Sequence, residues 1–278
     1  MNLGIRAHDI NSFTPEEIAQ IIADKGLSAV QLALKKSFPH LNIENGSLSP
    51  GLAYYIGKEF QKRNIQIAVL GCYINIIHPD LSQRKMLLDY FKEHIRYARD
   101  FGCSIVGTET GNVHEKMGYT IDNFQEKPFL EVADSVKELV NEAEKFGVIV
   151  GIEAGINHPV YTPKLMKRLL EVVDSNNLQV IFDPVNFLTE ETYLNQEEIF
   201  QEAIDLFGDR ICIVHCKDFE IVHGKLQVVP VGRGRLNYDF LMKLIKSKKP
   251  YINFLMEATK EPYIDASIVY LKSKFKNA

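Results

Sequence analysis

Short apolar runs alternate with longer amphipathic segments along the whole chain. The runs have the length of buried β-strands, whereas the segments between them repeat apolar residues at helical spacing. Eight strands are expected, at residues 3–7, 29–34, 65–74, 104–109, 148–154, 179–184, 211–218 and 252–258. Strand–helix alternation favours a parallel sheet, and eight such units in 278 residues favour a closed (β/α)8 barrel.

The alternation is not interrupted by a linker. We therefore expect one α/β domain over residues 1–278, a single (β/α)8 TIM barrel. A doubly wound open sheet is the alternative fold. No G-x-G-x-x-G motif follows the first strand, which weakens that alternative.

The amphipathic segments carry helix signals at their ends. Thr14 is predicted to cap the first helix, with Glu17 completing a capping box three residues later. Three later helices are expected to end on glycine, at Gly102, Gly147 and Gly208.

Charge and composition argue against nucleic acid and membranes as partners. The 32 basic and 36 acidic residues give a net charge of −4, which offers no footprint for a polyanion. No stretch is long enough to span a bilayer, and the first residues lack a signal pattern. The four cysteines form no C-x-x-C pair, as expected for reduced thiols in a cytoplasmic protein. Twelve Tyr and 16 Phe would permit an aromatic homo-oligomer interface, although no residue requires one.

Polar residues end four consecutive strands, where a barrel carries its chemistry. Glu153, Asp183, His215 and Glu257 each follow an apolar run, and successive strand ends are neighbours around the barrel rim. Buried together, the three carboxylates would repel each other and all four groups would lack partners. One divalent cation resolves both problems, and this oxygen and nitrogen set suits Mn²⁺, Mg²⁺, Co²⁺ or Zn²⁺. Each residue alone could be a helix cap, a surface carboxylate or a satisfied histidine, but four in sequence favour a metal site.

The same region resembles the xylose-isomerase-like TIM barrels, specifically the sugar phosphate isomerase/epimerase group. The resemblance is sharpest in GIEAG, FDPVN, VHCKD, PVGRGRLNY and FLMEA, between Gly151 and Ala258. It implies a divalent metal held by Glu153, Asp183, His215 and Glu257. It also implies that Glu153 and Glu257 are catalytic and move a proton on and off the carbon beside a ketose carbonyl, through a metal-stabilised enediolate. The substrate implied is a small sugar or sugar phosphate.

Two positions depart from the ketose 3-epimerases of that group. Asn186 stands where many relatives have a second histidine, and Ile221 stands where those epimerases have a substrate-binding arginine. Asparagine can donate a hydrogen bond but cannot be charged. Arg233 is the candidate to replace the arginine. These departures weaken the case for a ketose 3-epimerase in particular and leave the metal site unaffected.

Further residues are expected to contact substrate at the barrel mouth. Lys217 would hold a substrate oxygen or a phosphate, although a salt bridge with a neighbouring carboxylate is an equal alternative. Glu109 ends the fourth strand and His78 follows the third. The expected substrate-binding set is therefore Lys217, Asn186, Glu109, Arg233 and His78.

Three other functions compete with a sugar isomerase or epimerase. A dehydratase of a keto-inositol or sugar acid would use the same metal ligands, so the sequence does not separate the two. An endonuclease IV-like nuclease would need more histidines at strand ends than His215 alone. A non-catalytic sugar-binding barrel would be expected to have lost part of the ligand set, which here is complete.

Overall fold

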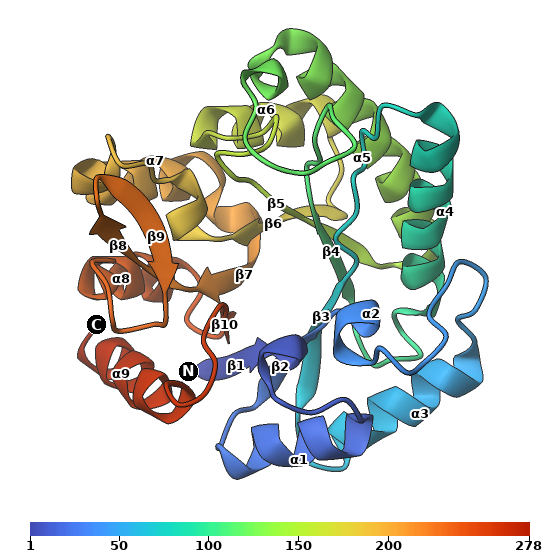
Figure 1. Ribbon diagram of the computed structural model, residues 1–278, viewed down its shortest axis with the longest axis horizontal. Helices are drawn as coiled ribbons and strands as arrows, with labels where there is room; N and C mark the ends of the chain where they lie inside the picture. Colours follow the sequence, from blue (N-terminus) through green and yellow to red (C-terminus); the bar gives the residue numbers. More distant parts are fainter.

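Eight parallel strands close into a barrel in the computed structural model, which describes residues 1–278 (Figure 1). Around the barrel the order is β1-β10-β7-β6-β5-β4-β3-β2. The strands are β1 (Asn2–Arg6), β2 (Ala29–Leu32), β3 (Gln66–Gly71), β4 (Ile105–Glu109), β5 (Ile149–Glu153), β6 (Leu178–Phe182), β7 (Ile211–Cys216) and β10 (Asn253–Met256). The predicted single TIM barrel is confirmed, and the alternative prediction of a doubly wound open sheet is wrong.

The helices form a ring outside the strands (Figure 1). They are α1 (Pro15–Asp24), α2 (Leu34–Ser37), α3 (Pro50–Gln61), α4 (Leu81–Tyr97), α5 (Glu126–Phe146), α6 (Pro163–Val173), α7 (Gln196–Phe207), α8 (Tyr238–Lys248) and α9 (Ile264–Asn277). Short 3₁₀ turns are η1 (Ala7–Asp9), η2 (Ile121–Phe124), η3 (Pro184–Phe187), η4 (Tyr193–Asn195) and η5 (Gly208–Arg210). No helix is long and apolar enough to cross a membrane.

Of the two hydrogen bonds in the capping box predicted for the first helix, only one forms. The Thr14 hydroxyl accepts a hydrogen bond from the backbone N–H of Glu17, at 3.3 Å. The Glu17 carboxylate does not return to Thr14 and instead accepts from the Ser12 hydroxyl at 2.5 Å. The capping box is therefore wrong, because a hydroxyl upstream competes for the glutamate.

The three glycine helix ends differ from one another. Gly147 ends α5 in the left-handed conformation, at φ 60°, as predicted. Gly208 follows α7 directly but is right-handed and continues into η5. α4 ends at Tyr97, so Gly102 lies in the turn beyond the helix, where it has φ 75°. The predicted end of α4 is therefore too late.

The core has two parts. A cluster of 73 buried residues fills the space between strands and helices, and a separate group of six fills the barrel interior: Ala29, Ala68, Val69, Ile181, Ile213 and Leu255. The interior is tight beside Gly107, where a Cβ would lie 2.6 Å from Cδ1 of Ile181. Gly107 therefore serves the packing of the barrel floor beneath the mouth.

An antiparallel hairpin, β8 (Asp218–Val222) and β9 (Lys225–Val229), follows β7 (orange in Figure 1). The sequence did not predict it, and the strand expected to run to residue 218 ends at Cys216. The turn is His223–Gly224, both at positive φ (51° and 74°), as a two-residue type I′ hairpin turn requires. A histidine in that turn is uncommon, so the turn signal was weak.

The loop that leaves this hairpin is organised by the buried Asp218 carboxylate. Asp218 accepts from the backbone N–H groups of Phe219 and Leu236, both at 2.9 Å, and of Gly232 at 3.0 Å. Asp218→Ala leaves these donors without an acceptor, so the free energy of unfolding is expected to fall by about 3 kcal/mol. Urea denaturation measures the change. The exposed control Asp209→Ala should stay within about 0.5 kcal/mol of wild type, and equal losses in both variants would contradict this account.

A buried histidine on α4 predicts acid sensitivity. Burial lowers the pKa of His94 to about 4, from 6.5, although the Tyr90 carbonyl accepts from its Nδ1 at 3.0 Å. Between these values the unfolded chain binds a proton that the folded chain does not, so stability falls as pH falls from 6.5 towards 4. Between pH 7 and pH 4.5, the free energy of unfolding should fall by about 2 kcal/mol less in His94→Gln than in wild type. Urea denaturation at both pH values tests this, and the exposed His40→Gln should keep the full wild-type loss.

Candidate metal centre

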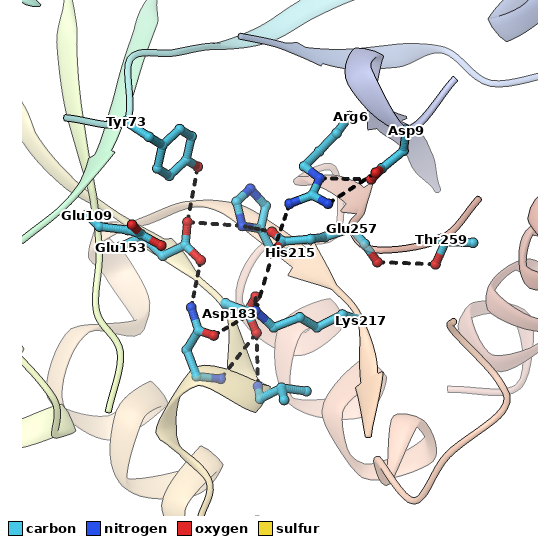
Figure 2. Close-up of polar contacts among 12 residues, drawn as sticks. Arg6, Asp9, Tyr73, Glu109, Glu153, Asp183, His215, Lys217, Glu257 and Thr259 are labelled. Carbon is cyan, nitrogen blue, oxygen red and sulfur yellow. Dashed lines mark hydrogen bonds and ion pairs between the residues drawn. The ribbon is translucent and has the colours of Figure 1, made fainter. Parts of the chain in front are cut away.

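Four side chains from neighbouring strands converge at the barrel mouth (Figure 2). Glu153 ends β5, Asp183 directly follows β6, His215 lies near the end of β7 and Glu257 directly follows β10. Each offers one ligand atom, and these atoms all lie within 4.8 Å of one another. The structure thus brings together the four residues that the sequence singled out, and they form a candidate metal site.

Two buried atoms of this cluster make no hydrogen bond and face the other ligand atoms, as metal ligands would. Nδ1 of His215 makes no hydrogen bond, although it lies 3.3 Å from a Glu153 oxygen and 3.2 Å from a Glu257 oxygen. Oδ2 of Asp183 also makes none, although Lys217 Nζ is 2.8 Å away. Unsatisfied buried polar atoms are costly, and a cation among these oxygen and nitrogen ligands would satisfy them.

The partners behind the ligands orient them. Nε2–H of His215 donates to Oε1 of Gln31 at 2.6 Å, so Nδ1 is the nitrogen that faces the carboxylates and, in the neutral imidazole, would offer its lone pair to a metal ion. The Gln31 amide donates in turn to the Tyr73 hydroxyl at 3.0 Å. That hydroxyl donates to Oε2 of Glu153 at 3.1 Å. A chain of hydrogen bonds therefore fixes one carboxylate and the imidazole together.

Asp183 and Asn186 link the end of β6 to Glu153 at the end of β5. Oδ1 of Asp183 accepts from the backbone N–H groups of Val185 and Asn186, at 3.0 and 3.3 Å, and so caps η3. The Asn186 amide donates to Oε1 of Glu153 at 2.8 Å. Its oxygen accepts from Lys217 Nζ at 2.6 Å. Asn186, predicted to bind substrate, therefore lies within the hydrogen-bond network of the cluster.

Two cations flank the carboxylates (Figure 2). Lys217 Nζ lies 2.8 Å from Asp183 and 3.5 Å from Glu257. Arg6 Nη1 lies 2.9 Å from Glu257, and its Nε lies 2.8 Å from Asp9. The salt-bridge alternative for Lys217 is thus realised in the structure.

These charges set the ionisation of the cluster. Burial and the neighbouring carboxylates raise the pKa of Asp183 to about 6, against the opposing effect of Lys217. Burial alone would raise the pKa of Glu257, but Lys217, His215 and Arg6 together hold it well below its usual range. Burial would lower the pKa of His215, yet Glu153 and Glu257 raise it to about 10. The cluster attracts positive charge strongly, whether a proton or a metal ion.

A small cavity of about 80 Å³ lies against the cluster, and we call it the metal-site cavity. Its walls include Glu153, Glu257, Arg6, Tyr73 and Glu109. The side chains of Glu153 and Glu257 therefore border one common space.

Glu109 belongs to a second ionisable pair at this cavity. Its Oε2 lies 3.6 Å from Nε2 of the buried His158, whose Nδ1–H donates to the Gly111 carbonyl at 2.9 Å. Burial would raise the pKa of Glu109, but His158 lowers it. Burial would lower the pKa of His158, but Glu109 raises it. Each partner therefore favours the charged form of the other.

Two of the predicted substrate-binding residues lie away from the cluster. The exposed Arg233 packs its guanidinium 5.1 Å from the ring centroid of Tyr263. Nδ1 of His78 accepts from the backbone N–H of Asp80 at 3.2 Å. The structure does not bring either of them to the four ligands.

Sequence reasoning missed Tyr73 altogether. It lies two residues beyond the end of β3, inside an apolar stretch, so its hydroxyl gave no motif. Arg6 and Gln31 were visible as polar residues in or at the end of early strands, but nothing in their spacing tied them to Glu257 or His215. Only the closure of the barrel, in which β1 pairs with β10 and β2 pairs with β1, brings them close.

The sequence itself decides the family. A sequence model of the xylose isomerase-like TIM barrel family matches residues 19–274. The chain belongs to this family. The resemblance seen in the strand-end motifs is thereby confirmed.

Solved structures of similar fold cover nearly the whole chain. The IOLI protein with a bound zinc atom is 18% identical, with a TM-score of 0.75 over 99% of this chain and 96% of that one. D-psicose 3-epimerase from Clostridium cellulolyticum H10, solved with D-tagatose, is 15% identical, with a TM-score of 0.76 over 99% of both chains. The 3-keto-D-glucoside 4-epimerase YcjR from E. coli is 15% identical, with a TM-score of 0.72 over 98% and 99%. At these identities the similarity establishes the fold alone.

One curated protein matches only locally. A probable nicotinate-nucleotide adenylyltransferase from Chlorobium phaeobacteroides (strain BS1) is 30% identical over 80 residues, 28% of this chain. The alignment spans 40% of that protein's length. So short a match establishes neither family nor activity.

Proposed function

We propose that this protein is a metal-dependent isomerase or epimerase of a small sugar. The observation that carries the proposal is the placement of Glu153 and Glu257 on the two sides of the unpartnered His215 Nδ1, at 3.3 and 3.2 Å. Both carboxylates also line the metal-site cavity. Two carboxylates that face one small space are suited to move a proton off one side of a carbon and onto the other.

Glu153, Asp183, His215 and Glu257 would hold the metal ion. When bound, a divalent cation would polarise the sugar carbonyl and stabilise the negative charge that develops on its oxygen. The ligand set suits Mn²⁺, Mg²⁺, Co²⁺ or Zn²⁺, and the zinc in the IOLI structure is consistent with this range.

The chain's own residues would carry the proton transfer. One of Glu153 and Glu257 removes the proton from the carbon beside the carbonyl, and the other returns one to give the isomer. Arg6, 2.9 Å from Glu257, and Asn186, 2.8 Å from Glu153, hold the two carboxylates in place. Lys217 remains a candidate for binding a substrate oxygen, if substrate displaces its contact with Asp183.

The structural neighbours suggest which sugars to test. One was solved with D-tagatose and another is named for a 3-keto-D-glucoside. Ketoses and keto-glycosides are therefore the first substrates to try, with sugar phosphates beside them.

Incubation in D₂O tests the proposal directly. The metal-loaded protein is expected to exchange the hydrogen beside the carbonyl of at least one of these sugars, as NMR would record. Exchange that is equal with and without protein across the whole panel would contradict the proposal.

The Glu109–His158 pair favours a second candidate, a dehydratase of a keto-inositol or sugar acid. Loss of a hydroxyl needs a proton donor, and the His158 imidazole, 3.6 Å from the cavity-lining Glu109, would supply one through that carboxylate. Mass spectrometry separates the two functions, because a dehydratase product has lost one water and an isomerase product has the mass of its substrate.

A further inference from the structure

A second and larger cavity lies beside the metal centre, and we call it the side cavity. Its volume is about 420 Å³. It lies between α2, the loop after α2, and α4, and that loop is held against α4 by hydrogen bonds from Gly46 and Leu48 to Glu93. Figure 1 shows α2 at the rim of the barrel and its loop running outward between α3 and one end of α4.

The two cavities share a wall. Tyr73 and Lys36 line both the side cavity and the metal-site cavity. The Tyr73 hydroxyl donates to Glu153, so one face of this residue belongs to the metal centre. Lys36 is exposed and its amine lies 5.8 Å from the Tyr73 ring centroid, without an ion-pair partner. Its side chain can therefore swing aside without breaking a salt bridge.

The two cavities differ in volume, and only the side cavity is large enough for most of a small molecule. The metal-site cavity, at about 80 Å³, is far smaller than the roughly 300–1,000 Å³ of typical small-molecule sites. The side cavity, at about 420 Å³, falls inside that range. A ligand that reacts at the metal centre would therefore place most of its volume elsewhere, and the adjoining space is the side cavity.

The chemistry of the side cavity favours an apolar occupant. Its walls include Leu34, Met86 and Leu87 and the rings of Tyr73 and Tyr90. Most of its polar groups already have protein partners. Lys35 pairs with Glu44 at 2.9 Å, and the Tyr90 hydroxyl donates to the Ile43 carbonyl at 3.1 Å.

Asn75, a further polar residue of the wall, is satisfied on both sides of its amide. It donates to the Asn112 and His114 carbonyls and accepts from the N–H groups of Ile77 and Asn112. A second sugar would need free donors and acceptors, whereas an aromatic ring needs only the apolar walls and the tyrosine faces.

We propose that the side cavity binds an aromatic substituent attached to the sugar that reacts at the metal centre. The substrate would be an aryl glycoside whose sugar ring carries a ketone, or a similar conjugate, with its sugar at Glu153 and Glu257 and its aromatic ring beyond Tyr73. The sugar half of this assignment rests on the proposed function. The ring half rests on the cavity alone.

The test is a binding measurement on the full-length, Mn²⁺-loaded protein. The probes are para-fluorophenyl β-D-glucoside, para-fluorophenol and methyl β-D-glucoside. Calorimetry measures the binding of all three, and fluorine NMR also records the binding of the two fluorinated probes. The aryl glucoside is expected to bind at least about tenfold more tightly than the methyl glucoside, because its ring leaves water for apolar walls.

Leu87→Trp fills the side cavity and should abolish most of this tenfold advantage while changing the affinity for methyl glucoside little. Leu81→Trp is the matched control, because Leu81 lies on the same helix but is 71% exposed and outside the cavity. The chain contains no Trp, so the emission of each new indole reports whether it is buried in a folded protein.

Three outcomes would overturn the proposal. They are equal affinities for the aryl and methyl glucosides, an aryl advantage that survives in Leu87→Trp, and no binding of either fluorinated probe at millimolar concentration. Because binding needs no turnover, a protein that shows the aryl advantage but exchanges no sugar hydrogen would fail the proposed function alone.

Discussion

Replacing Glu257 or Glu153 with glutamine is expected to slow hydrogen exchange beside the ketose carbonyl by about 10²–10⁴-fold. Glutamine keeps an oxygen that can face a metal ion but cannot accept the substrate proton. Both carboxylates line the same cavity, so each variant removes one of the two groups that the mechanism needs. NMR in D₂O measures the exchange rate of both variants and of wild type.

The metal content of each variant must be measured alongside, because both residues also belong to the ligand cluster. A variant that keeps its metal and loses exchange supports proton transfer by the missing carboxylate. The exposed Glu190→Gln serves as a surface control and should exchange at the wild-type rate. Wild-type exchange in metal-loaded Glu153→Gln and Glu257→Gln alike would contradict the assigned roles.

Removal of the metal ion by a chelator is expected to lower the melting temperature by about 10 °C. A ligand present at a thousand times its dissociation constant stabilises a protein by about 4 kcal/mol, and each kcal/mol is worth about 2–4 °C in a chain of this size. The three clustered carboxylates would also lose the cation that separates their charges. Differential scanning calorimetry with and without EDTA measures the shift.

His215→Ala supplies the control for this measurement. Its melting temperature should be the same with and without chelator, since it lacks the ligand that faces both glutamates. Readdition of Mn²⁺ to the chelator-treated wild-type protein should restore its original melting temperature. A wild-type protein that melts identically in EDTA and in Mn²⁺ would contradict a metal held by these residues.

The sequence predicted the barrel because its signal is local and repeated. Each strand is an apolar run that periodicity identifies without knowledge of its neighbours, and eight such runs leave few alternative folds. The β8–β9 hairpin escaped because its outer residues are exposed and its turn is His223–Gly224. The end of α4 was misplaced because Gly102 marks a turn that follows the helix rather than the helix end itself.

Within the site, the predictable part was what strand position determines. Glu153 and His215 each lie at or near the end of a strand, so barrel geometry alone brings them together. The contacts behind them depend on rotamers and on distant strands, such as the 2.6 Å bond between Gln31 and His215 across 184 residues of sequence. Arg233 is the sequence's candidate to replace a substrate-binding arginine, but its guanidinium packs over the ring of Tyr263.

The central claim is that Glu153, Asp183, His215 and Glu257 hold one divalent metal ion. Elemental analysis of purified wild type and His215→Ala, side by side after loading with Mn²⁺, Mg²⁺, Co²⁺ or Zn²⁺, tests it most directly. We expect about one equivalent in wild type and a large loss in the variant, because removing one of four ligands takes away the Nδ1 that no other group satisfies. No bound metal in wild type after loading with each ion, or equal metal in both proteins, would contradict the claim.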